Sequence, residues 1–444
     1  MGGPDRGGTA RTRRGRAGDH RRRRRQVTVR PPQWFVCVES NTTGTGRLFC
    51  AAARARGMRP VVLAKDPGRY PYLAEDGVDV RVVDTSDEVR VREVCRELAD
   101  SGGVAGVTSS SEYFVATAAA AAVALGLPAP DPAAITRCRD KARQRAVLAA
   151  AGVPVPVFRA VTDPAAAVAA AEEIGLPVVL KPTRGSGSVG VRLCHDRREV
   201  ADWAAGLFGA ANERGLPGGN EILVEEYVTG PEFSVETFDD EVVGVVGKLL
   251  GEQPYFVEVG HDFPARVPAA ERDALAACAR AALRALGLGW GAAHTELRQG
   301  ANGPVVIEVN PRLAGGLIPE LARVALDFDL VHALVARVAG AGRGLPGRGA
   351  DGANAVARHA AIRFVLTPGA GVVTSVEGLA EAAGVPGVTS VTVGAEPGDT
   401  LRRHHSFQDR LGHVLARGAD GAEAAARAES AVGLIRVNST VIAG

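Results

Sequence analysis

The sequence predicts an α/β protein of several domains, with α+β architecture in its later parts. The length of 444 residues corresponds to roughly three domains of ordinary size. In the first part of the chain, short apolar strands alternate with helices, as they do in an open parallel sheet. Later strands come instead in pairs joined by short turns, with alternating apolar and polar residues, which indicates antiparallel hairpins.

Composition excludes several classes of protein. Hydrophobic residues make up 46% of the chain and charged residues 23%, which is typical of a globular protein. The longest nearly apolar run, Val115 to Leu127, is too short to span a bilayer, and no N-terminal stretch has the character of a signal peptide. The six cysteines are scattered without metal-binding spacing, so we expect reduced thiols and a cytoplasmic protein with no membrane attachment.

The N-terminal segment differs from the rest of the chain in charge. Residues 1–30 hold eleven Arg and two Asp, a local charge of +9, which leaves −7 for the remainder. Because this segment cannot build a core, we expect a disordered Arg-rich tail over residues 1–30. The mildly acidic remainder gives no reason to expect a specific nucleic-acid partner, although an RNA-binding role for the tail is an alternative.

Residues 31–130 form the predicted N-terminal domain. Strands are expected at 34–38, 60–64, 78–83 and 104–108, with one helix ending near Arg56 and another at 87–100. The loop after the first strand contains Gly44-Thr45-Gly46, the beginning of a dinucleotide-binding fingerprint. Phe49 stands where that fingerprint needs a small residue, so anion binding at this helix N-terminus is favoured over NAD binding.

A central domain is predicted at residues 131–345, after a boundary rich in proline. Its expected elements are a helix at 133–151, strands at 178–182 and 222–224, a hairpin of 232–238 with 242–248, a helix at 270–286, and a second hairpin of 293–298 with 304–309. The Gly-rich residues 341–353 form a linker to a smaller mixed domain at 354–444.

The second hairpin carries two acids and an amide with strand spacing. Side chains alternate along a strand, so Glu308 and Asn310 project to one face, and Glu296 joins them if the hairpin closes as predicted. Two carboxylates and an amide oxygen suit Mg²⁺ held against phosphate oxygens. Arg312 follows two residues after Asn310, where it can neutralise a developing oxyanion.

A Gly/Ser-rich loop, Gly185 to Gly190, follows the strand that contains Lys181. Glycines let the backbone approach a polyphosphate, and successive N–H groups bind its oxygens. The loop is not a Walker A motif, because no Lys-Ser/Thr follows its last glycine. Only four of the 52 basic residues are lysine, so a lysine near this loop indicates a need for a compact charge, with chance as the alternative.

These motifs, in this order and approximate spacing, resemble those of ATP-grasp enzymes over about residues 31–444. The resemblance rests on Lys141, Lys181-Pro182, the Gly185–Gly190 loop, Glu225-Glu226-Tyr227-Val228 and Glu296…Glu308-Val309-Asn310-Pro311-Arg312. It implies an ATP-grasp fold with a lid at about 142–230. It also implies that ATP and two Mg²⁺ ions are required, with Mn²⁺ as a substitute metal.

The resemblance also implies a role for each motif. Arg312 would be catalytic, stabilising the acyl phosphate and the tetrahedral intermediate, and Glu296, Glu308 and Asn310 would bind the metal ions. The implied ATP-binding residues are Lys141, Lys181, Gly185, Ser186, Gly187, Ser188, Gly190, the adenine hinge Glu225, Glu226, Tyr227 and Val228, the ribose-binding Glu232, and Lys248 or Gln253.

Two further stretches resemble the L-amino acid ligases, the dipeptide-forming branch of this superfamily. They are Glu258 to Ala265 and Asn310 to Gly316, and they imply substrate contacts by Glu258, His261, Arg312, Gly315 and Gly316. A structural role for His261 is the alternative. The implied activity is ATP-dependent ligation of a small carboxylate to an amine, both from amino acids, through an acyl phosphate and with release of ADP. The resemblance also suggests a homodimer.

Two alternatives to this activity remain open. The segment Arg410 to Ala416 resembles the corresponding domain of biotin carboxylases, which allows a carboxylase or a nucleotide-biosynthesis ligase on the same scaffold. A non-catalytic ATP-binding protein is the other.

Overall fold

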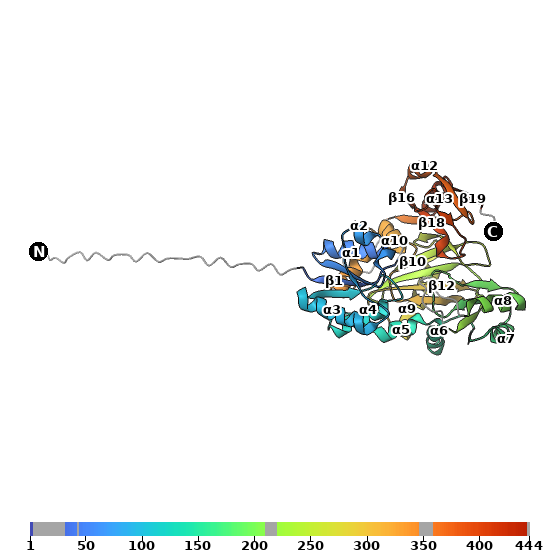
Figure 1. Ribbon diagram of the computed structural model, residues 1–444, viewed down its shortest axis with the longest axis horizontal. Helices are drawn as coiled ribbons and strands as arrows, with labels where there is room; N and C mark the ends of the chain where they lie inside the picture. Colours follow the sequence, from blue (N-terminus) through green and yellow to red (C-terminus); the bar gives the residue numbers. More distant parts are fainter. Residues whose placement is uncertain (3–31, 42–43, 209–219, 346–357, 442–444) are drawn as a thin grey trace.

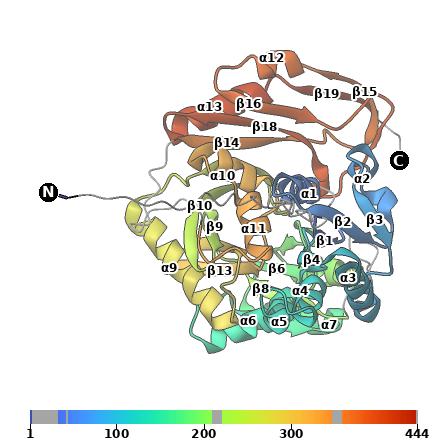
Figure 2. The ribbon, with the colours of Figure 1, turned by 90° about the vertical axis from the view of Figure 1, so that its left-hand side faces the viewer.

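The computed structural model describes residues 1–2, 32–41, 44–208, 220–345 and 358–441. Most of the predicted Arg-rich tail and much of the Gly-rich linker lie outside these residues. Figure 1 shows the chain from its N-terminal domain to its C-terminal segment, and Figure 2 shows it turned about the vertical axis, with the C-terminal segment at the top in both views. Of the helices that the structure describes, none is long and apolar enough to cross a membrane.

The N-terminal domain is the open parallel sheet that the sequence predicts. Its strand order is β3-β2-β1-β4, and every pairing is parallel. All five residues of β1 are buried, because helices cover both faces of the sheet. The strands are β1 (Trp34–Val38), β2 (Arg59–Ala64), β3 (Asp79–Val82) and β4 (Val104–Thr108), and the helices are α1 (Thr45–Ala55), η1 (Pro67–Arg69), α2 (Tyr72–Glu75), α3 (Glu88–Gly102) and α4 (Val115–Ala124).

The predicted helix at 133–151 is wrong in one respect, because the chain forms two helices there. They are α5 (Pro132–Arg139) and α6 (Lys141–Ala150). Asp140 separates them with an extended backbone, and its side chain accepts a hydrogen bond from the Arg143 amide (3.2 Å). An aspartate in this position caps a new helix. The break places Lys141 at the first turn of α6.

A small antiparallel sheet with two helices lies in the part of the chain where the lid is predicted. Its strand order is β5-β8-β6-β7, with β5 (Phe158–Val161), β6 (Val178–Pro182), β7 (Arg192–Cys194) and β8 (Ile222–Glu226). The helices α7 (Pro164–Ile174) and α8 (Arg197–Leu207) pack on it and on each other. The predicted lid, about 142–230, also includes α6, which contacts α9 and β13 as well as β5.

The central sheet continues into the C-terminal segment, with strand order β13-β12-β9-β10-β11-β14-β18-β16. Both predicted hairpins are confirmed: β9 pairs with β10 and β12 with β13, each antiparallel. In the second hairpin the strands extend further than predicted, so only Ala301 and Asn302 form the turn. The elements are β9 (Glu232–Phe238), β10 (Glu241–Leu250), β11 (Glu258–Phe263), α9 (Ala269–Leu286), β12 (Ala292–Gly300) and β13 (Gly303–Asn310).

The C-terminal segment is less separate than the sequence suggests. Its strand β14 pairs with β11, so β14, β18 and β16 extend the central sheet, and a small separate sheet has the order β17-β15-β19. The elements are β14 (His359–Leu366), β15 (Gly371–Glu377), α12 (Leu379–Ala383), β16 (Val388–Val393), β17 (Thr400–Leu401), η2 (Phe407–Asp409), β18 (Arg410–Gly418), α13 (Gly421–Val432) and β19 (Arg436–Val441).

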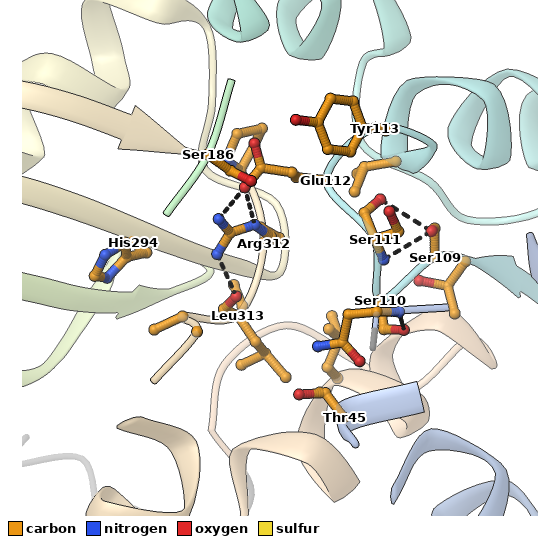
Figure 3. Close-up of a pocket in the computed structure, with 18 of the residues that line it drawn as sticks. Thr45, Ser109, Ser110, Ser111, Glu112, Tyr113, Ser186, His294, Arg312 and Leu313 are labelled. Atoms are coloured by element: carbon orange, nitrogen blue, oxygen red, sulfur yellow. Dashed lines mark hydrogen bonds and ion pairs between the residues drawn. The ribbon is translucent and has the colours of Figure 1, made fainter. Parts of the chain in front are cut away.

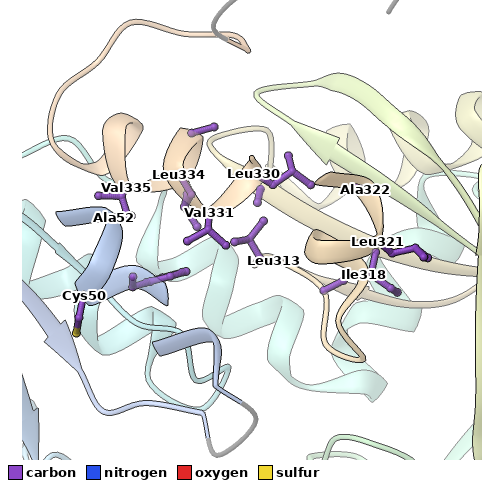
Figure 4. Close-up of a cluster of buried hydrophobic side chains, with 14 of the residues drawn as sticks. Cys50, Ala52, Leu313, Ile318, Leu321, Ala322, Leu330, Val331, Leu334 and Val335 are labelled. Carbon is purple, nitrogen blue, oxygen red and sulfur yellow. The ribbon is translucent and has the colours of Figure 1, made fainter. Parts of the chain in front are cut away.

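One apolar core joins the N-terminal domain to the central sheet. Helix α11 (Leu330–Val338) packs against α1, and α10 (Ile318–Leu326) packs against α11 and the strands β11 and β14; buried side chains of this core are shown in Figure 4. Leu321 and Val335 are completely buried, and each such side chain stabilises the fold by roughly 1.5–3 kcal/mol. Leu313 belongs to this core, so the residue before it, Arg312, projects from a fixed backbone.

Candidate active site

The hairpin of β12 and β13 brings the predicted metal ligands together. Glu296 lies directly opposite Glu308 in the ladder, and His294 lies opposite Asn310. The side chains of both glutamates are about one-fifth exposed, whereas Asn310 is buried. The described residues contain no group of three or more His, Cys, Asp or Glu arranged to hold a metal ion. Two carboxylates and one amide still fit Mg²⁺, which keeps few protein ligands and takes phosphate oxygens for the rest.

Each of these carboxylates lies against a lysine. Lys141 Nζ is 2.9 Å from Glu308 and also donates to the carbonyl oxygen of Gly185 (2.9 Å). Lys248 Nζ is 2.8 Å from Glu296. Burial would raise the pKa of Glu296, but Lys248 and the neighbouring His294 hold it below the usual value. Glu296 is therefore ionised, as a carboxylate ligand of a hard cation must be.

A small cavity of about 120 Å³ contains most of the predicted nucleotide-binding residues. Lys181 pairs with Glu225 at 2.5 Å, and Arg145 pairs with the same carboxylate at 2.7 Å. Burial lowers the pKa of Lys181, whereas the two cations hold the pKa of Glu225 below its usual value against the effect of burial. The lining includes Lys141, Lys181, Gly185, Ser186, Gly187, Ser188, Glu225, Glu226, Tyr227, Val228, Glu232, Lys248, Glu296 and Glu308.

Some groups of the predicted adenine hinge are already engaged. The Glu226 amide donates to the Val157 carbonyl oxygen (2.8 Å), and the Val228 carbonyl oxygen accepts from Arg298 (2.8 Å). The side chain of Glu225 points to Lys181 rather than to the open part of the cavity. Gln253 is exposed between β10 and β11 and does not line either cavity, so the structure does not bring it to the site.

A larger cavity of about 520 Å³ lies beside the first and contains Arg312 (Figure 3). The guanidinium donates to both the carboxylate of Glu112 and the carbonyl oxygen of Leu313 (2.9 Å). Arg139 contacts the same carboxylate from the other side. Burial would raise the pKa of Glu112, but Arg139 and Arg312 lower it to about 2. Glu112 is therefore ionised and fixes the orientation of Arg312 at the cavity wall.

Glu258 lines both cavities and is tied to two cations. Its carboxylate is 2.7 Å from Lys248 and 2.5 Å from Arg410, and these charges hold its pKa well below the usual value although burial opposes ionisation. Lys248 also contacts Glu232, at 3.1 Å. This predicted substrate acid is therefore already balanced by cations of the protein itself.

The structure places His261 behind the cavity wall. It is completely buried, burial lowers its pKa to about 3, and its Nε2 lies 3.5 Å from Glu258. Gly316 separates it from the cavity, because a Cβ built there would lie 2.7 Å from Nε2. Gly315 and Gly316 do line the cavity, as the sequence predicts. The contacts of His261 thus support the structural alternative rather than direct substrate contact.

Sequence reasoning missed three residues that organise the site. Glu112 follows the carboxyl end of β4, where parallel sheets place binding groups, so its position was a usable signal. Arg145 lies on α6 but reaches Glu225 and the Ile307 carbonyl oxygen. Arg410 comes from the C-terminal segment. For the last two, the partner is far away in sequence and no local pattern identifies it.

Most of the chain is similar to known proteins. Three family models match successive parts of the chain: the ATP-grasp N-terminal domain at 50–129, the ATP-grasp domain at 174–320, and the L-amino acid ligase C-terminal domain 2 at 363–439. The D-alanine–D-alanine ligase of Desulforudis audaxviator (strain MP104C) is 31% identical over 311 residues, covering 66% of this chain and 91% of that protein. The chain belongs to the ATP-grasp family.

Two further similarities cover more of this ATP-grasp protein. The uncharacterized protein y4rH of Sinorhizobium fredii (strain NBRC 101917 / NGR234) is 40% identical over 384 residues, which is 86% of this chain and 78% of that protein. The crystal structure of the L-amino acid ligase from Bacillus licheniformis matches with a TM-score of 0.77 at 22% identity, over 92% of this chain and 99% of that chain. The ATP-grasp fold expected from the sequence is confirmed.

Proposed function

We propose that the protein is an ADP-forming carboxylate–amine ligase that joins two amino acids through an acyl phosphate. One observation carries the proposal: the small cavity with the phosphate-type loop and the larger cavity share Ser186, Gly187, Glu258 and Glu296. A γ-phosphate in the first cavity would thus meet a carboxylate in the second. The C-terminal family match and the D-alanine–D-alanine ligase relationship support an amine as the second substrate.

In the first step, a carboxylate oxygen of one substrate attacks the γ-phosphorus, and the bond from that phosphorus to the β,γ-bridging oxygen breaks. ADP leaves, and the acyl phosphate remains. Lys141 and Lys181 neutralise phosphate charge and position the nucleotide. Positioning and charge stabilisation account for most of the rate acceleration in enzymatic phosphoryl transfer. Glu296, Glu308 and Asn310 would hold Mg²⁺, which when bound offsets the negative charge of the phosphates.

In the second step, the amine nitrogen attacks the acyl carbon. Arg312, oriented by Glu112, donates to the oxygen that becomes negative in the tetrahedral intermediate. The intermediate collapses, the carbon–oxygen bond to phosphate breaks, and the nitrogen loses its proton to the medium. The lid must exclude water during both steps, since water would hydrolyse the acyl phosphate.

The test is to measure ADP, phosphate and coupled product in a matrix of L-amino acids, singly and in pairs, with ATP and Mg²⁺. The proposal predicts pair-dependent ADP release with an equal amount of amide. Both signals fall by about 10²-fold or more in Glu308→Gln and Arg312→Ala. ADP release that requires bicarbonate and no amine would favour a carboxylase instead. Tight ATP binding without ADP release under any of these conditions would indicate a non-catalytic protein.

A further inference from the structure

A turn of the C-terminal segment, residues 404–409, contacts the loop predicted to cover the phosphates. The Phe407 amide donates to the carbonyl oxygen of Gly187 (3.0 Å). The ring of Phe407 packs on the same glycine, since a Cβ built on Gly187 would lie 2.3 Å from Cδ1 of that ring. Gly187 has φ of 61°, in the region that favours glycine. Glycine at this position therefore lets the loop lie directly under the aromatic ring.

A second set of contacts holds the same loop from the lid side. The ring of His405 stacks on Tyr255, with centroids 3.8 Å apart and planes 14° apart, and Trp203 meets the edge of Tyr255 at 6.1 Å. The indole Nε1 of Trp203 donates to the carbonyl oxygen of Gly190 (3.1 Å). Tyr255 thus connects α8 to the C-terminal turn, and the two contact the loop at Gly190, its last residue, and at Gly187, near its middle.

Hydrogen bonds to Asp409 organise the C-terminal turn and attach it to the central sheet. The carboxylate of Asp409 accepts hydrogen bonds from the amides of His404 (2.6 Å) and His405 (2.8 Å). The carbonyl oxygen of Asp409 accepts from the Thr367 amide (2.8 Å), which ties the turn to the end of β14. The next residue, Arg410, binds Glu258 in the site. The ring of Phe407 is thus held in place by the central sheet.

Phe407 lies at the junction of the two cavities. It lines the larger cavity, and Gly187 lines both. We propose that Phe407 is a positioning residue that holds the Gly185–Gly190 loop closed over the phosphates of ATP, so that the C-terminal segment controls nucleotide affinity and the exclusion of water. The inference rests on the proposed function for the identity of the nucleotide. Without the ring, the loop opens more often, ATP binds more weakly and acyl phosphate is lost to water.

The first experiment compares Phe407→Ala, the conservative Phe407→Leu, and the matched control Arg402→Ala, whose side chain is exposed near the same turn. For Phe407→Ala we expect the KM for ATP to rise about tenfold and ADP formed per amide to rise at least about twofold, while kcat changes less than about threefold. Phe407→Leu restores most of the affinity, and Arg402→Ala behaves as wild type. An unchanged KM and an unchanged ADP-to-amide ratio in folded Phe407→Ala overturn the inference.

A second experiment needs no ligase activity. Hydrogen exchange of the 183–193 amides is measured with Mg²⁺ and a non-hydrolysable ATP analogue. We expect the nucleotide to slow exchange of these amides in the wild type. In Phe407→Ala the protection factor that the nucleotide adds should be at least about fivefold smaller. If no amino-acid pair gives amide but this difference is found, the proposed function falls and the inference stands. If amide forms and protection is equal in both proteins, the inference falls and the proposed function stands.

A third variant covers the case in which Phe407→Ala does not fold. Gly187→Ala keeps the ring but places a Cβ against it, and it should raise the KM for ATP in the same direction. Where both single variants fold, the double variant tests direct coupling. If the ring acts through Gly187, the two effects on the KM are less than additive, and full additivity contradicts the contact.

Discussion

Replacing Lys248 with methionine removes a cation from the centre of the site. Its Nζ lies 2.7 Å from Glu258, 2.8 Å from Glu296 and 3.1 Å from Glu232, and its side chain is 1% exposed. Methionine keeps much of the volume and leaves these acids without their shared cation. Removing one partner of a buried ion pair costs about 3–5 kcal/mol. We expect Lys248→Met to lower the free energy of unfolding by about that amount at pH 7.5.

The loss in free energy of unfolding caused by Lys248→Met depends on pH. In the wild type, Lys248 holds the pKa of Glu296 and of Glu258 below the usual value although burial would raise both. A glutamate whose pKa is lower in the folded protein stabilises the fold at pH values above its pKa in the unfolded chain, which is about 4.3. That stabilisation is lost as the pH falls through the pKa of the folded protein. In Lys248→Met, His294 still lowers the pKa of Glu296 and Arg410 still lowers that of Glu258. Burial already raises the pKa of Glu232, and without Lys248 to oppose it that pKa rises further. Protonation then removes the unpaired negative charge from the interior of the variant. The loss in free energy of unfolding caused by Lys248→Met therefore becomes smaller as the pH falls from 7.5 to 5.5.

The assay is urea unfolding followed by tryptophan fluorescence, without nucleotide, at both pH values. Lys65→Met is the matched control, because Lys65 pairs with Asp84 at 3.1 Å but the two side chains are 65% and 50% exposed. An exposed pair contributes about 0–1 kcal/mol. Equal losses in the two variants, or a deficit that widens toward pH 5.5, would refute the reasoning.

Two other predictions concern the larger cavity. Glu112→Gln should lower kcat for ligation about 10–100-fold with little change in the KM for ATP, because Arg312 loses the carboxylate that orients it. Steady-state kinetics measure both constants, and a fall in ATP affinity without a fall in kcat would contradict this prediction. Gly316→Ala should lower the free energy of unfolding by about 1–3 kcal/mol, since its φ is 58° and a Cβ would meet His261. Gly315→Ala is the control, with no heavy atom within 4 Å of its Cβ, and equal losses in denaturant melts would be inconsistent with this account.

Local patterns were sufficient for the parallel sheet and for the second hairpin. The spacing of Glu308 and Asn310 predicts that these two side chains share a face of their strand. The pairing of Glu296 with Glu308 depends also on a bulge between Glu296 and Leu297, which the sequence did not predict. The break between α5 and α6 at Asp140 was not predicted, because an aspartate within a helical pattern is not by itself evidence that a new helix begins there.

Long-range pairings were not predictable in this way. Arg312 meets Glu112 across 200 positions of sequence, and the pairing of β14 with β11 depends on which strand edge the folded sheet leaves available. The resemblance to L-amino acid ligases implied a substrate contact for His261, with a structural role as the alternative, and the backbone of Gly316 lies between this side chain and the cavity. Sequence spacing therefore identified the groups of the site better than their partners.

The acyl phosphate can be tested directly by following oxygen from the substrate carboxylate. Once the amino-acid pair is known, the carboxylate donor is labelled with ¹⁸O and the released phosphate is examined by mass spectrometry. Attack of the carboxylate on the γ-phosphorus transfers one labelled oxygen to phosphate when the amine displaces it. The account predicts one ¹⁸O per phosphate in step with amide formation. Unlabelled phosphate released alongside amide would contradict it.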